Sequence, residues 1–310
     1  MTYKAQLTRF IAAAFILPFS LVFSSAFASA EQAQSNTQAP FRISLIHTAQ
    51  STGSPEALLV EGGSWVKIRK LVHGSLLIEH PEGNLLFDTG LGRQIDQAFA
   101  HNSWWQRQLF AYENVNPALD QMREQGLTER HISAIILSHL HWDHTGGLPD
   151  FPNTPVWVQP QGLDQAQHRA HRPAFLPELL ENAQWSELVL SAQPYLGFAQ
   201  TLDIYQDGRL ILVDLSGHSE GQVGLFVNLD SGRSLFFIGD SSWVIEGIKN
   251  NKPRPSIVDL VSPVDWSRVM NDYVIEKIHN LSVKYPDLVI VPAHDEIVAG
   301  SIALFPQYEH

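Results

Sequence analysis

The chain has 310 residues, 44% of them hydrophobic and 17% charged, a composition typical of a folded globular protein rather than a disordered one. Its formal net charge of −12 argues against nucleic acid and anionic membrane surfaces as partners. The sequence contains no cysteine, which excludes disulfide bridges, thiolate metal sites and cysteine nucleophiles.

The N-terminal residues have the layout of a secretory signal peptide. Residues 1–30 carry Lys4 and Arg9 but no acid, and a short apolar stretch leads to small residues that fit cleavage near Ala28 or Ala30. This stretch is shorter than the roughly 20 apolar residues that span a bilayer, so we expect cleavage and no stable membrane anchor. Residues 31–40 are polar and predict a disordered leader. We therefore expect an exported bacterial protein, periplasmic or secreted, with one hydrolase domain over 41–310.

The body of the chain alternates short β-rich runs with helical runs. Strands are predicted over 65–79, 84–88, 132–137, 156–158, 201–205, 209–215, 222–228, 234–238 and 288–291. Helices are predicted over 117–125, 162–170, 177–182 and 266–284. This mixture indicates a layered α/β or α+β domain, whose topology the pattern alone does not determine.

Residues 94–112 form an aromatic-rich connection that includes Trp104 and Trp105. Two interpretations are open for it. One is a helix that packs its aromatic side chains into the core. The other is a lid over a site or a contact in a homodimer, because an excess of aromatic residues on a connection is typical of ligand walls.

The strongest chemical signal is the run from His139 to His144, which directly follows a predicted strand and reads His-Leu-His-Trp-Asp-His. In extended backbone His139 and His141 point the same way, so their imidazoles can hold one metal ion. Asp143 and His144 follow as the chain turns and can face a second ion. A chance cluster of these four side chains at a strand end is improbable.

Three further candidate ligands also come directly after predicted strands. They are His218, Asp240 and His294. The whole set offers only nitrogen and oxygen, which suits zinc first, with iron, cobalt or manganese as alternatives. Two such ions can share a carboxylate and a water that becomes the nucleophile near neutral pH. The set predicts hydrolysis without a protein nucleophile.

These residues, in this order, resemble the metallo-β-lactamase superfamily. The resemblance extends from Phe41 to the C-terminus and implies an α+β fold, a four-layer αββα sandwich with a dinuclear site at one edge. It implies that one ion is held by His139, His141 and His218. It implies that the other ion is held by Asp143, His144 and His294. Asp240 would bridge the two ions, and Asp88 would steady the ligands through hydrogen bonds.

Within this superfamily the full His/Asp set resembles glyoxalase II, N-acyl homoserine lactone lactonases and the methyl parathion hydrolase type of organophosphate hydrolase. The secretory signal argues against glyoxalase II, whose substrate is cytosolic. Similar lactonases often have a tyrosine three residues after the bridging aspartate, where this chain has Trp243. We expect a hydrolase of small esters or lactones, with phosphotriesters as the alternative. Asp143 is expected to carry a proton, and Trp142, Trp243, Trp104 and Trp105 are expected to line the substrate pocket.

A rival interpretation comes from the run Gly-His-Ser-Glu-Gly at 217–221, which matches the nucleophile motif of serine hydrolases and would make Ser219 the nucleophile. That motif requires a helix after the serine, whereas residues 222–228 read as a strand. It also leaves the histidine cluster unexplained. The remaining histidines near the first strands, His47, His73 and His80, are expected to be structural.

Overall fold

The computed structural model describes residues 40–169 and 171–310. The predicted signal peptide and all but the last residue of the predicted leader lie outside these ranges. None of the described helices is both long and apolar enough to cross a membrane.

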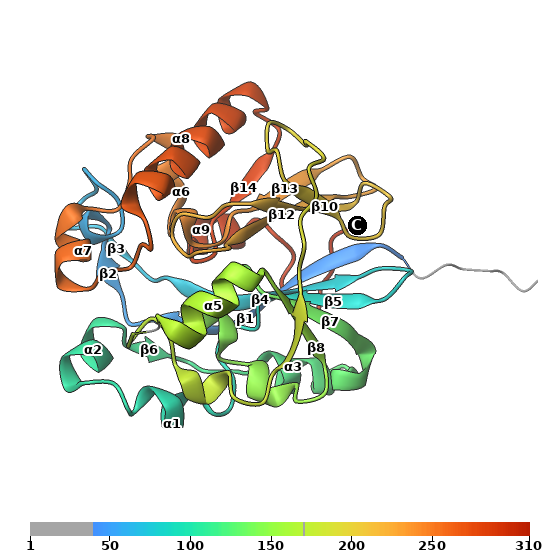
Figure 1. The fold of residues 1–310 in the computed structure, drawn as a ribbon, viewed down its shortest axis with the longest axis horizontal. Coiled ribbons are helices and arrows are strands. Elements are labelled where there is room, and N and C mark those ends of the chain that lie inside the picture. The colour runs from blue at the N-terminus through green and yellow to red at the C-terminus, as the bar shows by residue number, and fades with distance from the viewer. Residues whose placement is uncertain (1–39, 170) are drawn as a thin grey trace, which may run out of the picture. The chain divides into compact units, whose positions relative to one another are not determined.

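Two β-sheets face each other in the described part of the chain (Figure 1). The first has the strand order β6-β1-β4-β5-β7-β8-β9, and its strands are β1 (Arg42–Ser51), β4 (Val72–Glu79), β5 (Asn84–Phe87), β6 (Tyr112–Glu113), β7 (Ile132–Ile136), β8 (Pro155–Val158) and β9 (Gln184–Glu187). The second has the order β10-β11-β12-β13-β14, and its strands are β10 (Thr201–Asp203), β11 (Leu210–Asp214), β12 (Val223–Asn228), β13 (Ser234–Phe237) and β14 (Val289–Val291). A short separate pair joins β2 (Ser54–Pro55) to β3 (Ile68–Arg69).

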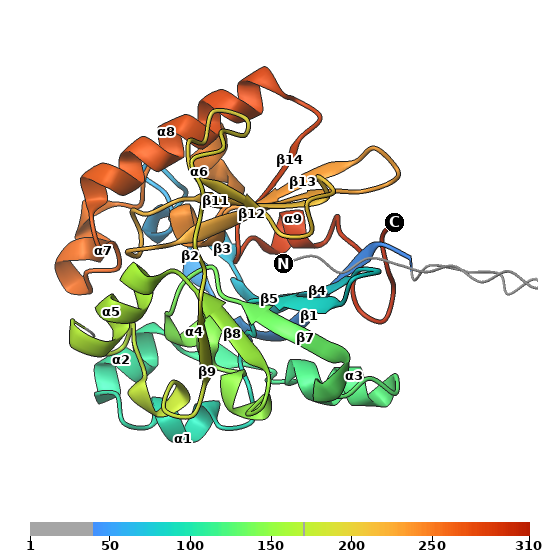
Figure 2. The ribbon, with the colours of Figure 1, turned by 45° about the vertical axis from the view of Figure 1, so that its right-hand side comes forward.

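Helices cover the outer faces of both sheets (Figure 2). The α-helices are α1 (Ile95–Phe99), α2 (Trp104–Leu109), α3 (Ala118–Glu124), α4 (Trp142–Thr145), α5 (Pro160–His168), α6 (Ile245–Lys249), α7 (Ser256–Val261), α8 (Arg268–Lys284) and α9 (Glu296–Ala299). The 3-10 turns are η1 (Glu56–Leu58), η2 (Glu129–His131), η3 (Leu148–Asp150), η4 (Pro177–Leu179) and η5 (Gly239–Ser241).

The alternation of side chains along the strands produces the layers. On β4, Leu76 and Ile78 belong to the core between the sheets, whereas Leu77 packs on the outer face among residues of α3 and α5. Successive side chains on a strand point to opposite faces, so a strand that is apolar throughout needs cover on both sides. The outer face of the second sheet packs against α6 and α8. The expected αββα sandwich is confirmed.

Some expected elements differ from the structure. The single strand expected over 65–79 is two strands, β3, which pairs with β2, and β4, which begins at Val72. Trp65 and Val66, which are 69% and 90% exposed, belong to neither. The expected helix over 177–182 is only the 3-10 turn η4. Strands β1 and β9 were not among the predicted strands, and their polar residues obscure the alternation by which a strand is recognised.

Candidate metal centre

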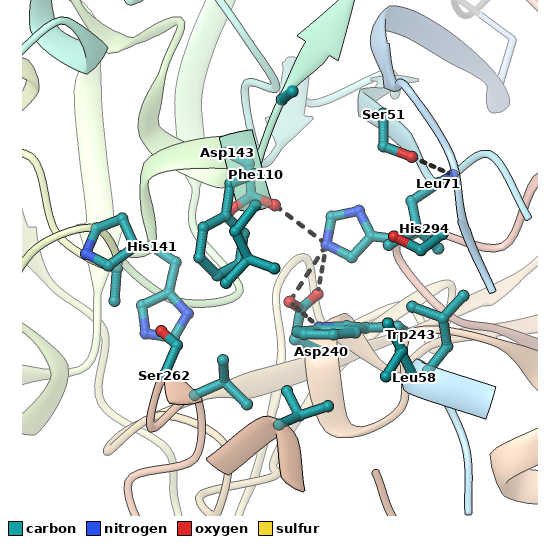
Figure 3. A pocket seen from close by; sticks show the side chains of 18 of the residues that line it. Ser51, Leu58, Leu71, Phe110, His141, Asp143, Asp240, Trp243, Ser262 and His294 are labelled. Carbon is teal, nitrogen blue, oxygen red and sulfur yellow. Dashed lines mark hydrogen bonds and ion pairs between the residues drawn. The ribbon is translucent and has the colours of Figure 1, made fainter. Parts of the chain in front are cut away.

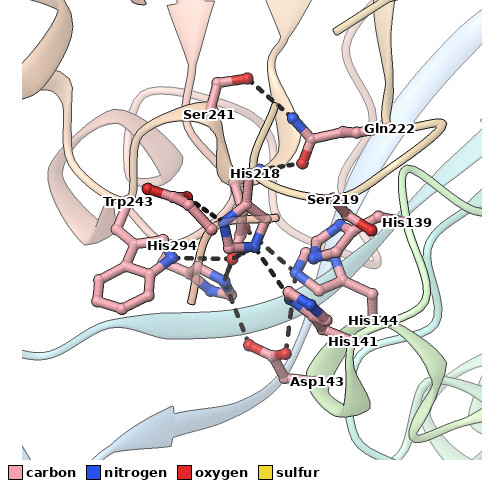
Figure 4. Close-up of polar contacts among 12 residues, drawn as sticks. His139, His141, Asp143, His144, His218, Ser219, Gln222, Ser241, Trp243 and His294 are labelled. Carbon is pink, nitrogen blue, oxygen red and sulfur yellow. Dashed lines mark hydrogen bonds and ion pairs between the residues drawn. The ribbon is translucent and has the colours of Figure 1, made fainter. Parts of the chain in front are cut away.

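The seven predicted ligands follow the ends of four strands and lie together in two adjoining groups. Figure 4 labels six of them. His139 and His141 follow β7, and His141 is the N-cap of α4, so the helix turn carries Asp143 and His144 back over the same point. His218 follows β11, Asp240 lies in η5 after β13, and His294 follows β14. All of them except Asp143 are buried in the described structure.

The ligand atoms form two adjoining groups. In one, atoms of His139, His141 and His218 lie within 4.8 Å of one another. In the other, atoms of four residues meet the same limit: Asp143, His144, Asp240 and His294. Two groups of three and four nitrogen and oxygen donors match the coordination needs of two divalent ions.

Asp240 lies between the two groups. Its Oδ1 is 3.0 Å from His294 Nε2 and 3.2 Å from His144 Nε2, both in the second group. Its Oδ2 is 3.5 Å from His218 Nε2, in the first group. Oδ2 also lies 3.2 Å from His294 Nε2, so the Asp240 carboxylate contacts both groups, which is the placement expected for a bridging ligand.

Unpartnered buried atoms show that these residues fit metal ions. His139 Nε2, His144 Nε2 and Asp240 Oδ1 are buried and make no hydrogen bond of good geometry with a described residue, although His144 Nε2 and Asp240 Oδ1 lie 3.2 Å apart. Folded proteins pair nearly all buried polar atoms, and an exception needs an explanation such as an ion. Because these atoms belong to the two groups of candidate ligands, divalent metal ions would be fitting partners for them.

The outer nitrogens of the histidines are held by other parts of the chain. Asp88 Oδ2 lies 2.8 Å from His144 Nδ1, and its other oxygen accepts the backbone N–H of Ser138 at 2.7 Å. The carbonyl oxygen of Val72 lies 2.7 Å from His294 Nδ1. Such contacts fix the ring orientation and leave the inner nitrogen free to bind a metal. The structure thus places Asp88 where the resemblance expects it.

Sequence reasoning missed one of these supporting contacts. Asp265 Oδ1 lies 2.9 Å from His218 Nδ1, and Arg254 donates to the same oxygen. Burial raises the pKa of Asp265, but Arg254 and His218 outweigh it and hold this pKa at about 2. No local pattern marks Asp265, since it lies in a loop far from His218 along the chain.

The electrostatics differ between the two groups of candidate ligands. Burial and the neighbouring imidazoles lower the pKa values of His139 and His141 well below the ordinary value, so both rings are neutral at pH 7. Burial lowers the pKa of His144 too, but Asp88 and Asp240 outweigh it and raise this pKa well above 6.5. Metal binding must therefore displace a proton from His144.

A cavity of about 270 Å³ opens directly in front of the metal site (Figure 3). Its floor contains Asp143, Asp240 and His294, and its walls are largely apolar, with Leu58, Leu71 and Phe110 among the lining residues. The helix α7 contributes three more apolar side chains to this wall: Ile257, Val258 and Val261.

The four tryptophans expected in the pocket divide into two pairs. Trp142 and Trp243 line the cavity, and the indole N–H of Trp243 donates to Asp240 Oδ2 at 2.8 Å. Trp104 and Trp105 do not line it, because they begin α2 and are 73% and 39% exposed, whereas the end of that segment reaches the cavity through Leu109 and Phe110.

Segment 94–112 has a mixed role. Phe99 is buried and packs against Trp142 at 4.7 Å between ring centroids, as a core helix would. Leu109 and Phe110 belong to the pocket wall instead. Phe99 thus fits the core interpretation, and Leu109 and Phe110 contribute to the cavity wall, whereas a lid or a dimer contact stays a prediction.

Ser219 does not have the surroundings of a nucleophile. It is buried, and its hydroxyl donates to Gln165 Oε1 at 2.9 Å. An activated serine needs a base within hydrogen-bond reach, and no histidine in the described ranges is hydrogen-bonded to this hydroxyl. Residues 223–228 form β12, not the helix that the serine motif requires.

Known proteins are similar to this chain in sequence and fold. A family model described as the metallo-β-lactamase superfamily matches residues 70–294. The N-acyl homoserine lactonase AttM of Rhizobium radiobacter is 25% identical over 248 residues, which cover 75% of this chain and 85% of the relative. The N-acyl homoserine lactonase of Bacillus thuringiensis is 25% identical over 241 residues, which cover 75% of this chain and 84% of the relative.

Solved structures agree with the family match. One is an N-acyl homoserine lactone hydrolase with its product N-hexanoyl-L-homoserine bound at the catalytic metal centre. It is similar to this chain with a TM-score of 0.67 at 20% identity, covering 86% of this chain and 98% of the solved one. The prediction of a metal-dependent hydrolase is confirmed. The chain belongs to the metallo-β-lactamase superfamily.

Proposed function

We propose that this protein is an exported, dinuclear metal-dependent hydrolase that opens small lactones or esters. The observation that carries this proposal is the convergence of seven His and Asp side chains, some with unpartnered buried atoms, beside an apolar cavity that five of them line. The curated N-acyl homoserine lactonases that the chain resembles support lactones as the first substrates to test.

Two metal ions, when bound, supply an activated water as the nucleophile and polarise the scissile carbonyl. The chain's own residues do the rest. The apolar wall of Leu58, Leu71 and Phe110 binds the carbon chain of the substrate and excludes bulk water. Asp143 sits on the cavity floor, where its carboxylate can carry a proton to the leaving oxygen.

Trp243 orients the carboxylate that lies between the two groups. Its indole N–H has Asp240 Oδ2 as its acceptor, and Arg254 stacks over the indole ring at 4.9 Å. An indole nitrogen has a single proton to donate, so in this geometry Trp243 positions Asp240. A tyrosine at this place would offer its hydroxyl to the substrate as well.

The test is a substrate panel on the purified protein, loaded with Zn²⁺ or stripped by a chelator, with metal content measured on the same samples. The panel contains an N-acyl homoserine lactone, an aryl ester, a phosphotriester and a cephalosporin. We expect two equivalents of metal, turnover of the lactone or the ester, and loss of this turnover on chelation with recovery on adding Zn²⁺. Turnover that survives chelation, or no bound metal in active protein, would contradict the proposal, and preferential turnover of the phosphotriester would replace the substrate class.

Export is a separate part of the proposal and has its own measurement. Expression of the full chain in a Gram-negative host should yield a periplasmic or extracellular protein that begins just after Ala28 or Ala30. An intact N-terminus on a protein in the cytoplasmic fraction would contradict export without affecting the metal chemistry.

A further inference from the structure

His73 was expected to be structural, but the fold brings it to the wall of the active-site cavity. It lies near the start of β4, is 6% exposed and lines the cavity. Its ring packs near Trp142 and His294, with centroid distances of 5.5 and 5.1 Å. It is not a member of either group of candidate metal ligands.

A local irregularity of the sheet aims this side chain. The pairing of β1 with β4 shifts at Thr48, so that His47 lies opposite Gly74 and Ala49 lies opposite His73. Bulges of this kind redirect side chains and are over-represented next to active sites. Thr48 secures the bulge, because its hydroxyl donates to the carbonyl oxygen of His73 at 3.0 Å.

The Nδ1 atom of His73 faces a metal-ligand candidate. It lies 3.3 Å from Asp143 Oδ2 and has no hydrogen-bond partner of good geometry in the described structure, although it is buried. The same oxygen of Asp143 is 3.3 Å from His294 Nε2. Asp143 is thus held between a candidate ligand on one side and His73 on the other.

We propose that His73 is a positioning residue that orients the Asp143 carboxylate through its Nδ1 atom. A carboxylate accepts hydrogen bonds but donates none when ionised, so the nitrogen that faces it carries the proton. This contact limits the rotation of Asp143 and fixes its Oδ2 atom between His73 and the candidate ligand His294. Contacts of this type change metal affinity or activity by about 10- to 100-fold when they are removed.

Three substitutions distinguish the role of the Nδ1 atom of His73 from that of its Nε2 atom. His73→Phe keeps the aromatic packing and removes both nitrogens. His73→Asn keeps a hydrogen-bonding atom near the Nδ1 position, whereas His73→Gln keeps one near the Nε2 position. A control, His80→Asn, changes another buried histidine at the end of the same strand, whose contact is Asp207 and not the metal site.

The readout is Zn²⁺ affinity by competition with a chromophoric chelator, followed by kcat and KM on whichever substrate the panel identifies. We expect H73F and H73Q to weaken the binding of one of the two zinc equivalents and to lower kcat by about 10- to 100-fold with KM nearly unchanged. H73N should keep zinc affinity and kcat within about threefold of the parent protein, and the control H80N should bind zinc as the parent does. Melting temperatures of the metal-free proteins identify any variant that fails to fold, and the comparison of H73N with H73Q then tests the proposal.

The proposal is overturned if H73N does not restore the zinc affinity that H73F loses, or if H73Q restores it instead, which would assign the role to the Nε2 atom. It is also overturned if H73F and H73Q bind two zinc ions as tightly as the parent. The inference rests on the proposed dinuclear site but not on its substrate. Because zinc affinity is measured without substrate, a wrong substrate class leaves this result intact, whereas a parent protein that binds no zinc refutes the proposed function itself.

Discussion

At the scale of single residues, Asp240 has the most demanding position in the site. It lies between the two ligand groups, is 3% exposed, and accepts the indole N–H of Trp243. Burial raises the pKa of Asp240, but His294 and His144 outweigh it and hold this pKa well below 3.8. It is therefore ionised at neutral pH, as the proposed role of a ligand shared by two cations requires.

Replacing Asp240 tests whether two metal ions share its carboxylate. We expect Asp240→Ala to reduce bound zinc from two equivalents toward one and to lower kcat by at least about 100-fold, because both cations lose a charged ligand. Asp240→Asn keeps the shape and an acceptor for Trp243, so it isolates the charge. A variant with Ala that keeps two zinc ions and the parent rate would show that Asp240 does not bridge.

At the scale of elements, α7 joins the cavity wall to the metal ligands. Arg254 precedes the helix and Asp265 follows it, and these two buried side chains are ion-paired to each other. Arg254 also donates to the carbonyl oxygen of Asp240 at 2.9 Å. The ion pair therefore joins the two ends of the segment that contains α7, and the hydrogen bond from Arg254 fixes this segment to Asp240.

The two faces of α7 predict different effects on substrate binding. Val261 is 54% exposed and lines the cavity, whereas Leu260 is 80% exposed and does not. Val261→Ser should raise KM for a substrate with a long alkyl chain by about fivefold, equivalent to roughly 1 kcal/mol of lost apolar contact, and should change KM for a short-chain substrate little. Leu260→Ser, the matched control, should leave both KM values unchanged. Equal effects of the two substitutions would place the alkyl chain elsewhere.

At the scale of the whole molecule, a buried ion network ties distant segments together beside the site. Arg69 is 1% exposed and contacts Glu246 at 2.8 Å and Asp295 at 3.1 Å. Its further carboxylate partners are Glu56 and Glu296, which belong to η1 and α9. Since Asp295 adjoins the ligand His294, this network holds one side of the metal centre.

The network predicts acid sensitivity of the metal-free protein. The pKa of Glu56 is lowered from 4.5, chiefly by its hydrogen bond from Lys67. A folded-state pKa below the unfolded one stabilises the protein above the unfolded value, and this stabilisation is lost as pH falls from about 4.5 through the folded pKa. Urea unfolding at a series of pH values should show this decline.

Two matched substitutions show which carboxylate causes this acid sensitivity. Glu56→Gln should be less stable than the parent at pH 7 and should lose less stability on acidification. Glu113→Gln removes an exposed contact with Lys70 and should do neither, because exposed ion pairs contribute little. Identical pH profiles for the parent and the Glu56 variant would exclude this carboxylate as the source.

What the sequence by itself determined is the set of side chains that follow its strands. His139 to His144 lie together along the chain, and His218, Asp240 and His294 each follow an apolar run, so local pattern and the family resemblance were sufficient to predict the fold and the candidate ligands. Only the tertiary structure decided which other residues join them. No local pattern marks His73, Asp265 or Leu109, because each reaches the site through contacts with segments that are distant along the chain. Trp104 and Trp105 have suitable chemistry, but they are exposed on a helical turn and do not line the cavity. Periodicity reports which face of an element is apolar, but neighbours across the fold are determined by packing.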